Sequence, residues 1–174
     1  MNRKALLVIN MLNDFVKEDG KLYIGDWGRK IISPIQKEIE NFRKEKNLIF
    51  YICDHHRPDD KEFNLFPRHC ISGTKGAEII KELMPFKNDF IIYSRRFSGF
   101  FQTDLDISLR DEEILELELV GVCTNIAVFY TAASARMLNY KVIVLKDAVA
   151  SIDGEQAHNF ALKQMKDKLG VEIR

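Results

Sequence analysis

The segment Ala5-Leu-Leu-Val-Ile9 is an unbroken apolar run of strand length, and runs of this kind decide the fold. Five similar runs follow it, at residues 48–52, 90–93, 115–120, 142–145 and 171–173. A parallel strand with both faces covered is apolar along its whole length. The runs therefore predict the buried strands of a parallel sheet. The fourth run is the exception, because Glu116 and Glu118 alternate with leucines and predict a less buried start.

Helical patterns fill the intervals between these runs. Apolar residues at three- and four-residue spacing predict one long amphipathic helix, namely Ile31, Ile32, Ile35, Ile39 and Phe42. Pro34 interrupts the pattern, so the helix is expected either to start at or after this residue or to kink there. Further helices are predicted at residues 77–83, 103–110, 125–138 and 156–169. The alternation of strands and helices predicts an α/β fold with helices on both faces of the sheet.

Length and composition limit the classes of function. A chain of 174 residues fits one domain, residues 1–174. The 26 basic residues balance the 26 acidic ones, so no net charge attracts nucleic acid or an anionic membrane. No apolar stretch approaches the roughly 18–20 residues needed to cross a bilayer, which predicts a cytoplasmic protein. The three cysteines, an odd number, are expected to be reduced thiols.

A long polar connection follows the second predicted strand. Residues 53–75 lack a clear period, and loops longer than about 12–15 residues in compact domains are usually functional or disordered. Ligands of open parallel sheets bind outside the carboxyl ends of the strands. The segments expected to line such a site are residues 10–15, 54–70, 94–100 and 122–125.

Three of the four histidines lie in this connection, together with several carboxylates. Imidazole and carboxylate ligands suit zinc, iron or manganese, and a loop can fold several of them around one ion. The residues expected to bind such a divalent metal are Asp54, His56, Glu62 and His69. The alternative is a polar surface loop in which the charges are solvated and His69 bonds locally. His55 is expected to point to the opposite side, because neighbouring side chains in an extended segment alternate.

Four segments, each at the end of a predicted strand, together carry a family resemblance. They are Ala5-Leu-Leu-Val-Ile-Asn-Met-Leu-Asn-Asp-Phe15, Asp54-His-His56 through Phe66-Pro-Arg-His-Cys70 to Gly73-Thr-Lys-Gly76, Arg96-Phe-Ser-Gly-Phe100 with Thr103-Asp-Leu-Asp106, and Gly121-Val-Cys-Thr-Asn-Ile-Ala-Val128. On these segments the chain resembles the isochorismatase-like hydrolases, and within them the nicotinamidases. The resemblance covers almost the whole length of the chain.

The resemblance implies a three-layer, Rossmann-like fold with a six-stranded, mostly parallel sheet. It also implies a pocket for a small-molecule ligand, no nucleotide cofactor, frequent homo-oligomerisation, and a cis peptide bond between Val122 and Cys123. The four metal-binding residues named above match the ligand pattern of similar nicotinamidases. The resemblance therefore strengthens the expectation of a divalent metal.

Members of this family use an aspartate as the base, a lysine that lowers the pKa of a thiol, and a cysteine that attacks a carbonyl. The corresponding positions of this chain read Asn10, Ser94 and Ala127. A neutral amide takes no proton at pH 7, a serine supplies no positive charge, and an alanine methyl forms no covalent intermediate. The resemblance therefore predicts that covalent chemistry of the family type is absent.

Neighbouring residues offer partial substitutes for the missing groups. A one-residue shift at the lysine position would bring in the cation of Arg95, but it would supply no thiol. Cys123 is either a substitute nucleophile or a small buried apolar residue beside a ligand. Phe15 and Phe97 are candidate walls of an aromatic pocket, in which Asn10 donates a hydrogen bond to a bound carbonyl or carboxylate. The alternative for both phenylalanines is ordinary core packing.

Three functional hypotheses follow. The leading one is a catalytically silenced member of this family that keeps a metal and a small-molecule pocket. The second is an active hydrolase that uses a metal-bound water, since a bound ion lowers the pKa of water towards about 7. The third is a non-catalytic regulatory subunit that pairs with an active relative.

Overall fold

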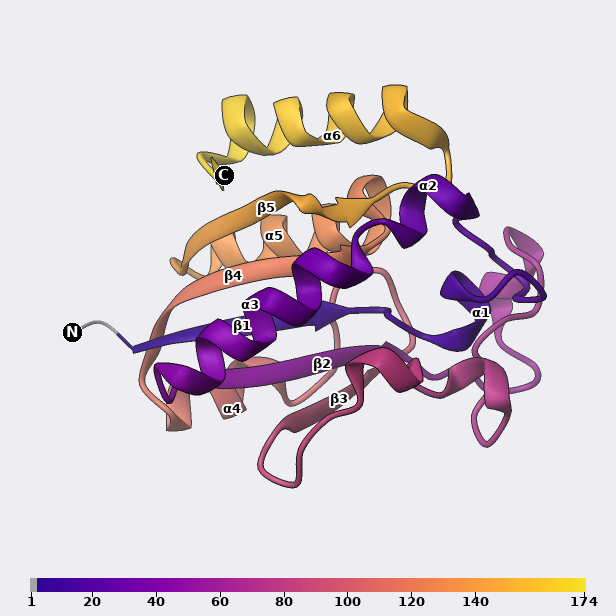
Figure 1. Cartoon of the computed structure of the whole chain (residues 1–174), viewed down its shortest axis with the longest axis horizontal. Helices are drawn as coiled ribbons and strands as arrows, with labels where there is room; N and C mark the ends of the chain where they lie inside the picture. The colour runs from indigo at the N-terminus through magenta and orange to yellow at the C-terminus, as the bar shows by residue number, and fades with distance from the viewer. Residues whose placement is uncertain (1–2) are drawn as a thin grey trace.

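Six strands form one parallel sheet at the centre of the molecule (Figure 1). The computed structural model describes residues 3–174. Its strands are β1 (Arg3–Ile9), β2 (Leu48–Asp54), β3 (Phe90–Ser94), β4 (Ile114–Val122), β5 (Lys141–Ala150) and β6 (Glu172–Ile173). They lie in the order β3-β2-β1-β4-β5-β6, and all five neighbouring pairs are parallel. The predicted α/β fold and its six strands are confirmed.

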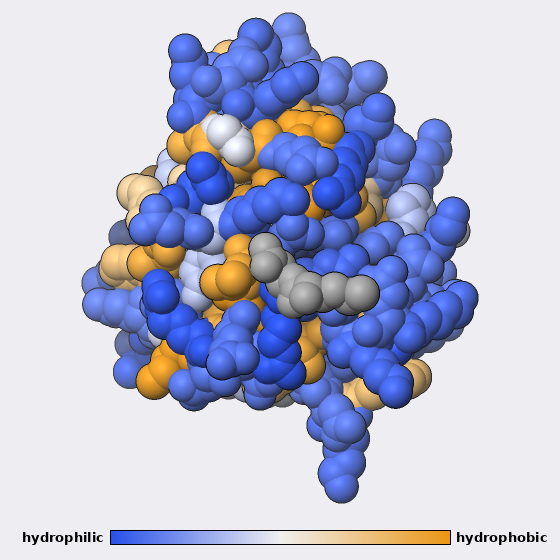
Figure 2. Space-filling view, turned by 90° about the vertical axis from the view of Figure 1, so that its left-hand side faces the viewer, coloured by the Kyte–Doolittle hydropathy of each residue, from blue (hydrophilic) through white to orange (hydrophobic). Residues whose placement is uncertain are grey.

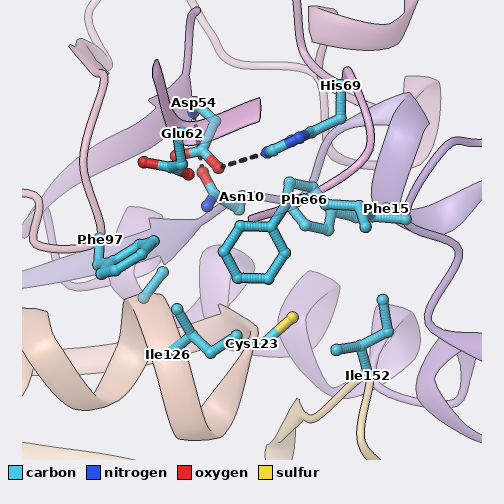
Figure 3. Close-up of a pocket in the computed structure, with 12 residues that line it drawn as sticks. Asn10, Phe15, Asp54, Glu62, Phe66, His69, Phe97, Cys123, Ile126 and Ile152 are labelled. Carbon is cyan, nitrogen blue, oxygen red and sulfur yellow. Dashed lines mark hydrogen bonds and ion pairs between the residues drawn. The ribbon is translucent and has the colours of Figure 1, made fainter. Parts of the chain in front are cut away.

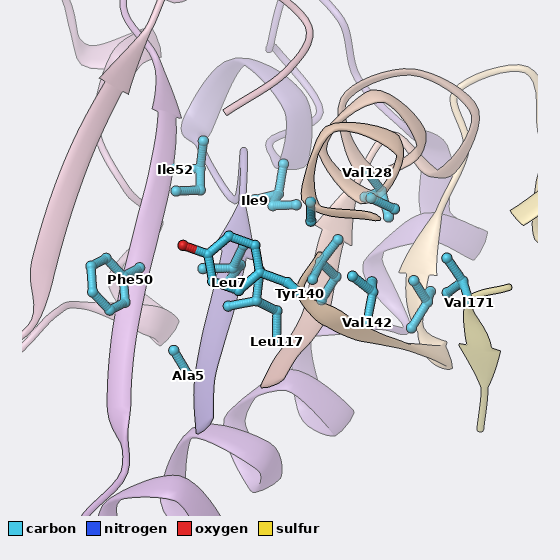
Figure 4. Packing of buried hydrophobic residues seen from close by; sticks show 14 of the residues in the cluster. Ala5, Leu7, Ile9, Phe50, Ile52, Leu117, Val128, Tyr140, Val142 and Val171 are labelled. Atoms are coloured by element: carbon cyan, nitrogen blue, oxygen red, sulfur yellow. The ribbon is translucent and has the colours of Figure 1, made fainter. Parts of the chain in front are cut away.

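Helices cover both faces of the sheet, so the fold has three layers (Figure 1). One face packs against α4 (Leu105–Asp111), α5 (Phe129–Met137) and α6 (Gly154–Leu169), and the other against α1 (Asn13–Val16), α2 (Gly25–Arg29) and α3 (Ile32–Lys44). Along β1, Leu7 enters the first core, where it lies with Ala5 and Ile9 (Figure 4), and Leu6 enters the second. Every residue from 5 to 9 is at most 1% exposed. Burial on both faces explains why this strand is apolar throughout.

The long amphipathic helix forms as predicted, with a start slightly earlier than expected. Helix α3 begins at Ile32, two residues before Pro34. The backbone N–H groups of a first helical turn have no partner inside the helix, so a proline there removes no hydrogen bond. Ile35, Ile39 and Phe42 are buried on its inner face. Pro34 therefore marks the first turn of the helix.

The prediction of a short helix at residues 77–83 is wrong. Two 3₁₀ turns occur there instead, at Lys75–Ala77 and Lys81–Leu83. The backbone between them pairs with the segment after β1, since Asn13 N–H donates to Glu78 O at 2.9 Å and Ile80 N–H donates to Met11 O at 3.0 Å. These backbone groups are occupied by a distant segment and cannot complete a helix.

The start of β4 is less buried than the rest of this strand, but only over its first residues. Leu115 is 57% exposed, so the less buried start that the sequence predicts is present, but it is a leucine that is exposed there, whereas Glu118 is only 3% exposed. The Glu118 carboxylate lies 3.7 Å from Lys4 Nζ and 3.7 Å from Arg174 Nη1. Two partial ion pairs therefore accompany this buried acid at the side of the molecule where the strands begin.

The side of the molecule where β1 begins is largely hydrophilic, with small separate apolar areas (Figure 2). The opposite side carries the long connections that follow β1 and β2 (Figure 1). Among residues 3–174, no helix is long and apolar enough to cross a membrane. The polar segments singled out from the sequence thus gather at one side, beyond the carboxyl ends of the strands.

Candidate active site and metal centre

A small pocket lies beyond the carboxyl ends of four strands and encloses about 40 Å³ (Figure 3). Asn10 follows β1, Asp54 ends β2, Cys123 follows β4 and Ile152 follows β5. Eight of the predicted site residues line this pocket, namely Asn10, Phe15, Asp54, Glu62, Phe97, His69, Cys123 and Ala127. Segments far apart in the sequence therefore meet where the rule for parallel sheets places a ligand.

The backbone around the pocket is shaped by tight approaches that few residue types allow. Gly121 has φ 109°, and a Cβ on it would collide with the carbonyl oxygen of Ile9. This glycine lets β4 pass close to β1 just before the turn into the pocket. The peptide bond between Val122 and Cys123 is cis, as the resemblance implies. A π-helical turn at Thr124–Val128 then leads into α5 and carries Ala127 to the pocket wall.

Asp14 ties the long connection after β2 to the N-terminal segment. Its Oδ2 accepts a hydrogen bond from Cys70 N–H at 2.7 Å. Gly76 leaves room for this carboxylate, because a Cβ at position 76 would collide with it. The same connection is held again where His56 N–H donates to Cys70 O at 2.9 Å. These contacts fix the loop that presents the histidines.

Three of the predicted metal ligands form a compact donor cluster. One side-chain donor atom each from Asp54, His56 and His69 lies within 4.8 Å of the others. Asp54 Oδ2 is 3.7 Å from His69 Nε2 and 3.9 Å from His56 Nε2, which is too long for a hydrogen bond. Atoms that each lie about 2.1 Å from one ion are roughly 3–4 Å apart. The spacing suits donors arranged around a common centre.

Glu62, the fourth predicted ligand, lies beside this cluster rather than within it, because its carboxylate is not among the donor atoms that lie within 4.8 Å of one another. Its Oε1 is 3.8 Å from His56 Nε2, and the residue is only 9% exposed. Two atoms in this region, His56 Nε2 and Glu62 Oε2, are buried without any hydrogen-bond partner among the described residues. A buried polar atom left unpaired costs about 1–3 kcal/mol, so each needs an explanation. A divalent ion would satisfy both, and the residues present therefore fit such an ion.

Hydrogen bonds behind the cluster orient its two imidazoles. His69 Nδ1 lies 2.8 Å from Pro67 O, and because a carbonyl only accepts, Nδ1 carries the proton and Nε2 is left as the acceptor. His56 Nδ1 lies 3.4 Å from Asp60 Oδ2. Partners of this kind usually set the tautomer of a metal-binding histidine. Both Nε2 atoms face Asp54.

Asp60 is itself held by two cations. Its fully buried carboxylate lies 3.0 Å from Arg95 Nε and 3.1 Å from Arg96 Nη1. Burial alone would raise the pKa of Asp60, but the backbone N–H of Glu62, Arg95, His56 and Arg96 outweigh it and keep the pKa well below its ordinary value. This carboxylate is therefore a permanent anion behind His56.

The ionisable groups of the cluster influence one another strongly. Burial would raise the pKa of Asp54, yet the neighbouring imidazoles of His56 and His69 outweigh it and hold the pKa below its ordinary value. Burial would lower the pKa of His56, but Asp54, Glu62 and Asp60 together raise it above the ordinary value. Burial is also the main reason that the pKa of Glu62 is raised. Protons and a metal ion would compete for these atoms.

Comparison with known proteins places the chain in a family. Residues 4–174 match the isochorismatase domain. This chain belongs to the isochorismatase family. The crystal structure of nicotinamidase/pyrazinamidase PncA from Bacillus subtilis is similar, with 34% sequence identity, a TM-score of 0.92 and 98% of each chain covered. The predicted family and the predicted isochorismatase-like fold are both confirmed.

Two further members of the family bear on the site. Pyrazinamidase of Pyrococcus horikoshii, solved in complex with zinc, is 31% identical with a TM-score of 0.91, over 99% of this chain and 98% of that one. A relative from Arabidopsis thaliana, named a probable inactive nicotinamidase, is 32% identical over 179 residues, covering 97% of this chain and 90% of the relative. The family thus includes a zinc complex and a member named as probably inactive.

The three residues predicted to stand at the family's catalytic positions have different surroundings in this chain. Asn10 and Ala127 line the pocket. Ser94 is only 1% exposed. Its Oγ donates a hydrogen bond to Arg96 O at 2.7 Å, so its side chain closes a local turn. Arg95 and Arg96 both bind Asp60, so neither cation is free to replace the lysine. Among residues 3–174, no lysine or arginine lines the pocket.

Cys123 lacks the features of an activated thiol. It lines the pocket and is 4% exposed. Burial raises its pKa to about 12. Thiolate rather than thiol is the nucleophile, and a cysteine with so high a pKa is almost wholly protonated at pH 7. The geometry thus favours Cys123 as a small apolar wall residue.

Several residues of the site were missed from the sequence. Asp60 was passed over among the many acids of its loop, although it lies between two proposed ligands. Ile152 follows the fifth strand, and the rule that ligands bind at carboxyl ends would have included it. Leu22 has no comparable sequence signal, because it reaches the pocket from the turn after α1. His55 points away from the cluster and stacks on Tyr93 with 4.2 Å between ring centroids, as expected from alternation.

Proposed function

We propose that this chain is a catalytically silenced member of the isochorismatase family that keeps a divalent-metal site and a small-molecule pocket. The observation that carries the proposal is Ala127, whose methyl group lines the pocket at the position of the family's nucleophile. Asn10 in the same pocket takes up no proton at neutral pH, and the thiol of Cys123 is protonated. The pocket can hold a carbonyl compound, but it has no group to attack one.

Asp54, His56, Glu62 and His69 would hold the metal. The unpaired buried atoms His56 Nε2 and Glu62 Oε2 support this assignment, and the zinc complex of the Pyrococcus relative supports a divalent ion. A bound ion supplies a positive charge that can polarise the carbonyl of a ligand. The chain's own residues orient the ligand atoms, because Asp60 and the carbonyl of Pro67 fix the two imidazoles.

A second candidate function is metal-assisted hydrolysis without a thiol. The observation that favours it is Glu62, a carboxyl in the pocket wall whose Oε2 is unpaired and whose pKa is raised by burial. A carboxyl that takes up and releases a proton beside a substrate can act as a general acid or base. This candidate requires the metal for every turnover, whereas silencing predicts no turnover with or without it.

One experiment separates the two. Ammonia release from nicotinamide, pyrazinamide and a panel of simple amides is measured with the purified protein loaded with zinc, manganese or iron, and again after chelation. The Bacillus subtilis nicotinamidase is the positive control. We expect no release above buffer from any loaded form. Turnover that chelation abolishes would establish the second candidate, and turnover that persists after chelation and in Cys123→Ala would defeat both proposals.

We also propose that the chain forms homo-oligomers in the cytoplasm. Ile107 on α4 and Tyr130 and Met137 on α5 are 48–76% exposed, so these helices present apolar surface. Such surface is costly to leave in water and commonly marks contacts between chains. Light scattering of the purified protein at micromolar concentration tests this, and a monomeric mass would contradict it. Co-purification with an active relative would instead favour the regulatory-subunit hypothesis.

A further inference from the structure

Strand β3 is an edge of the sheet and leaves some of its backbone groups without a partner. It is the outermost strand on its side, and among the helices and strands of residues 3–174 only β2 packs extensively against it (Figure 1). His55 N–H donates to Ser94 O at 2.8 Å, so the polar backbone groups of Ser94 point towards β2. Because these groups alternate in direction along a strand, those of Ile91 and Tyr93 point away from β2. Such an open edge is a template for another strand.

The side chains of the same two residues make this edge apolar. Ile91 is 42% exposed and Tyr93 is 57% exposed. Natural edge strands are commonly protected by lysine, proline or a bulge, but residues 90–94 contain no lysine or proline and pair with β2 without a register shift. Met84, which is also 57% exposed, lines a groove of about 430 Å³ together with both side chains. Apolar surface therefore extends from the strand onto the segment that precedes it.

This edge is complementary to itself, so a second copy of the chain fits it. A two-fold axis between the Ile92 residues of two copies would align their β3 strands antiparallel and set Ile91 of each copy opposite Tyr93 of the other. Both residues direct their N–H and C=O groups outward, so each such pair can exchange two hydrogen bonds. A register shifted by one residue would instead set outward groups against inward ones. A β-branched residue opposite an aromatic one is also a favourable cross-strand pair.

The charges that flank the strand do not oppose this pairing. In the same register Asp89 of one copy faces Arg95 of the other, so opposite charges meet at both ends of the paired strands. Within each chain, Asp89 is already paired with Arg43, and Arg95 with Asp60. These charges therefore add attraction at a distance rather than a new direct ion pair. Like charges do not face each other at either position.

We propose that β3 is a dimerisation edge, at which two copies of this chain pair antiparallel through Ile91 and Tyr93 and join their sheets into one. The inference rests on the proposed homo-oligomerisation and assigns a contact away from the apolar surface of α4 and α5. Ile92 enters the core beneath those two helices, so the side chains of its neighbours Ile91 and Tyr93 project from the opposite face of the sheet. The two surfaces can therefore be tested separately.

Ile91→Pro is the sharpest variant, because proline removes the outward N–H of this residue and leaves the hydrogen bonds to β2 in place. We expect the dissociation constant of the dimer, measured by sedimentation equilibrium, to rise at least about tenfold, since two hydrogen bonds are lost per dimer. Ile91→Lys should have the same effect by placing a charge on the edge. Leu115→Lys is the matched control, because Leu115 is 57% exposed on β4, two strands away from β3. Circular dichroism and thermal unfolding establish that each variant is folded.

Backbone amide exchange of the intact protein tests the pairing residue by residue. The amides of Ile91 and Tyr93 should become protected as protein concentration rises through the dissociation constant, whereas the amide of Ile92, which faces β2, should be protected at every concentration. Chains carrying Ile91→Cys and Tyr93→Cys test the register independently. Mild oxidation should link them when they are mixed and much less when they are kept apart, because paired residues lie about 5.5 Å apart. The three native cysteines are buried and should not interfere.

Three results would overturn the inference: a monomeric parent, unchanged self-association in both folded Ile91 variants, or protection of the Ile91 and Tyr93 amides that does not depend on protein concentration. The last result would mean that another segment of the same chain covers the edge. Loss of self-association in Met137→Lys, but in neither Ile91 variant, would assign the contact to α5 and defeat this inference alone. Ammonia release, measured separately, tests silencing, so turnover by a protein that dimerises through β3 would defeat the proposed silencing alone.

Discussion

The two sides of the pocket differ in charge and in how tightly their side chains are fixed. On one side, Asp54, His56 and His69 bring their donor atoms within 4.8 Å of one another. Behind them, Asp60 and Pro67 O bind the outer nitrogens of the two imidazoles. On the other side lie Asn10, Ala127 and Cys123, none of which carries a charge at neutral pH. One side is a crowded polar cluster and the other is neutral.

The two sides also differ in the free energy that their buried polar atoms cost the folded chain. His56 Nε2 and Glu62 Oε2 are buried and unpaired, and such atoms cost about 1–3 kcal/mol each. The neutral side carries no comparable penalty, since Asn10 Oδ1 and Ser94 Oγ are both hydrogen-bonded. Binding of a metal ion would offset this cost, because the ion would pair with both atoms. The geometry thus favours metal binding over covalent catalysis.

The largest expected effect comes from rebuilding the neutral side. The variant that combines Asn10→Asp, Ser94→Lys and Ala127→Cys should release ammonia from nicotinamide at least about 100-fold faster than the parent, because the three groups act as a unit. The single variant Ala127→Cys is the matched control, since a thiol without a base and a cation stays protonated. Activity in the single variant equal to that of the triple variant would show that the missing base and cation are not what silences the chain.

The next largest effect concerns the polar side. His69→Ala should lower zinc affinity by at least about 100-fold, since loss of a residue that merely orients a ligand already costs about 10–100-fold. His55→Ala is the control, because this histidine stacks on Tyr93 outside the cluster and should leave affinity unchanged. Competition with a chromophoric chelator measures both. Equal losses in the two variants would mean that zinc binds elsewhere in the loop.

The fold followed from the sequence because its signals are local and repeated. The run from Ala5 to Ile9 is apolar at every position, and each of these residues is buried in the observed sheet. The segment at residues 77–83 was misjudged because its backbone hydrogen bonds go to Met11 and Asn13. Such long-range pairing leaves no periodic pattern. Helical spacing alone therefore predicts a helix where the tertiary structure prevents one.

The candidate site was predictable where residue type limits the chemistry. Carboxylates and imidazoles in one loop indicate a metal, and the structure brings Asp54, His56 and His69 together. The orientation of these groups was not predictable, because Asp60 and Arg96 meet only after the chain has folded. Nor could the sequence show that Asn10 Oδ1 is already occupied, since the hydrogen bond from Asp54 N–H joins two strand ends that are 44 residues apart.

A smaller effect is expected from the residue behind His56. Asp60→Asn should lower zinc affinity by about tenfold, because a neutral amide orients His56 less firmly than the carboxylate does. Asp59→Asn is the control, since Asp59 is exposed and binds only Arg57. Thermal unfolding without metal checks that the folded fraction is unchanged. An Asp60→Asn protein that is fully folded and binds zinc as tightly as the Asp59→Asn protein would remove the orienting role.

The smallest effect concerns Glu118, a buried acid away from the pocket, and tests whether its charge destabilises the folded chain. Burial raises the pKa of Glu118, against the opposing effect of Lys4 and Arg174. A carboxyl whose folded pKa lies above its unfolded value loses stability as pH rises through the folded pKa. Glu118→Gln should therefore raise Tm at pH 7 by up to roughly 2–4 °C, corresponding to about 1 kcal/mol. The gain should shrink as pH falls through the ordinary glutamate pKa of about 4.3 and vanish about one pH unit below it, where the acid is protonated in both states.

The cations near Glu118 keep other partners after this substitution, which is why a gain is expected. Lys4 Nζ is 2.9 Å from Glu45, and Arg174 Nε is 2.7 Å from Glu172. Glu62→Gln is the comparison within the pocket, because it removes a buried acid that we assign to metal binding. Zinc should raise the Tm of Glu118→Gln as much as that of the parent, and that of Glu62→Gln by less. An equal zinc response in the two variants would show that Glu62 is no more a ligand than Glu118.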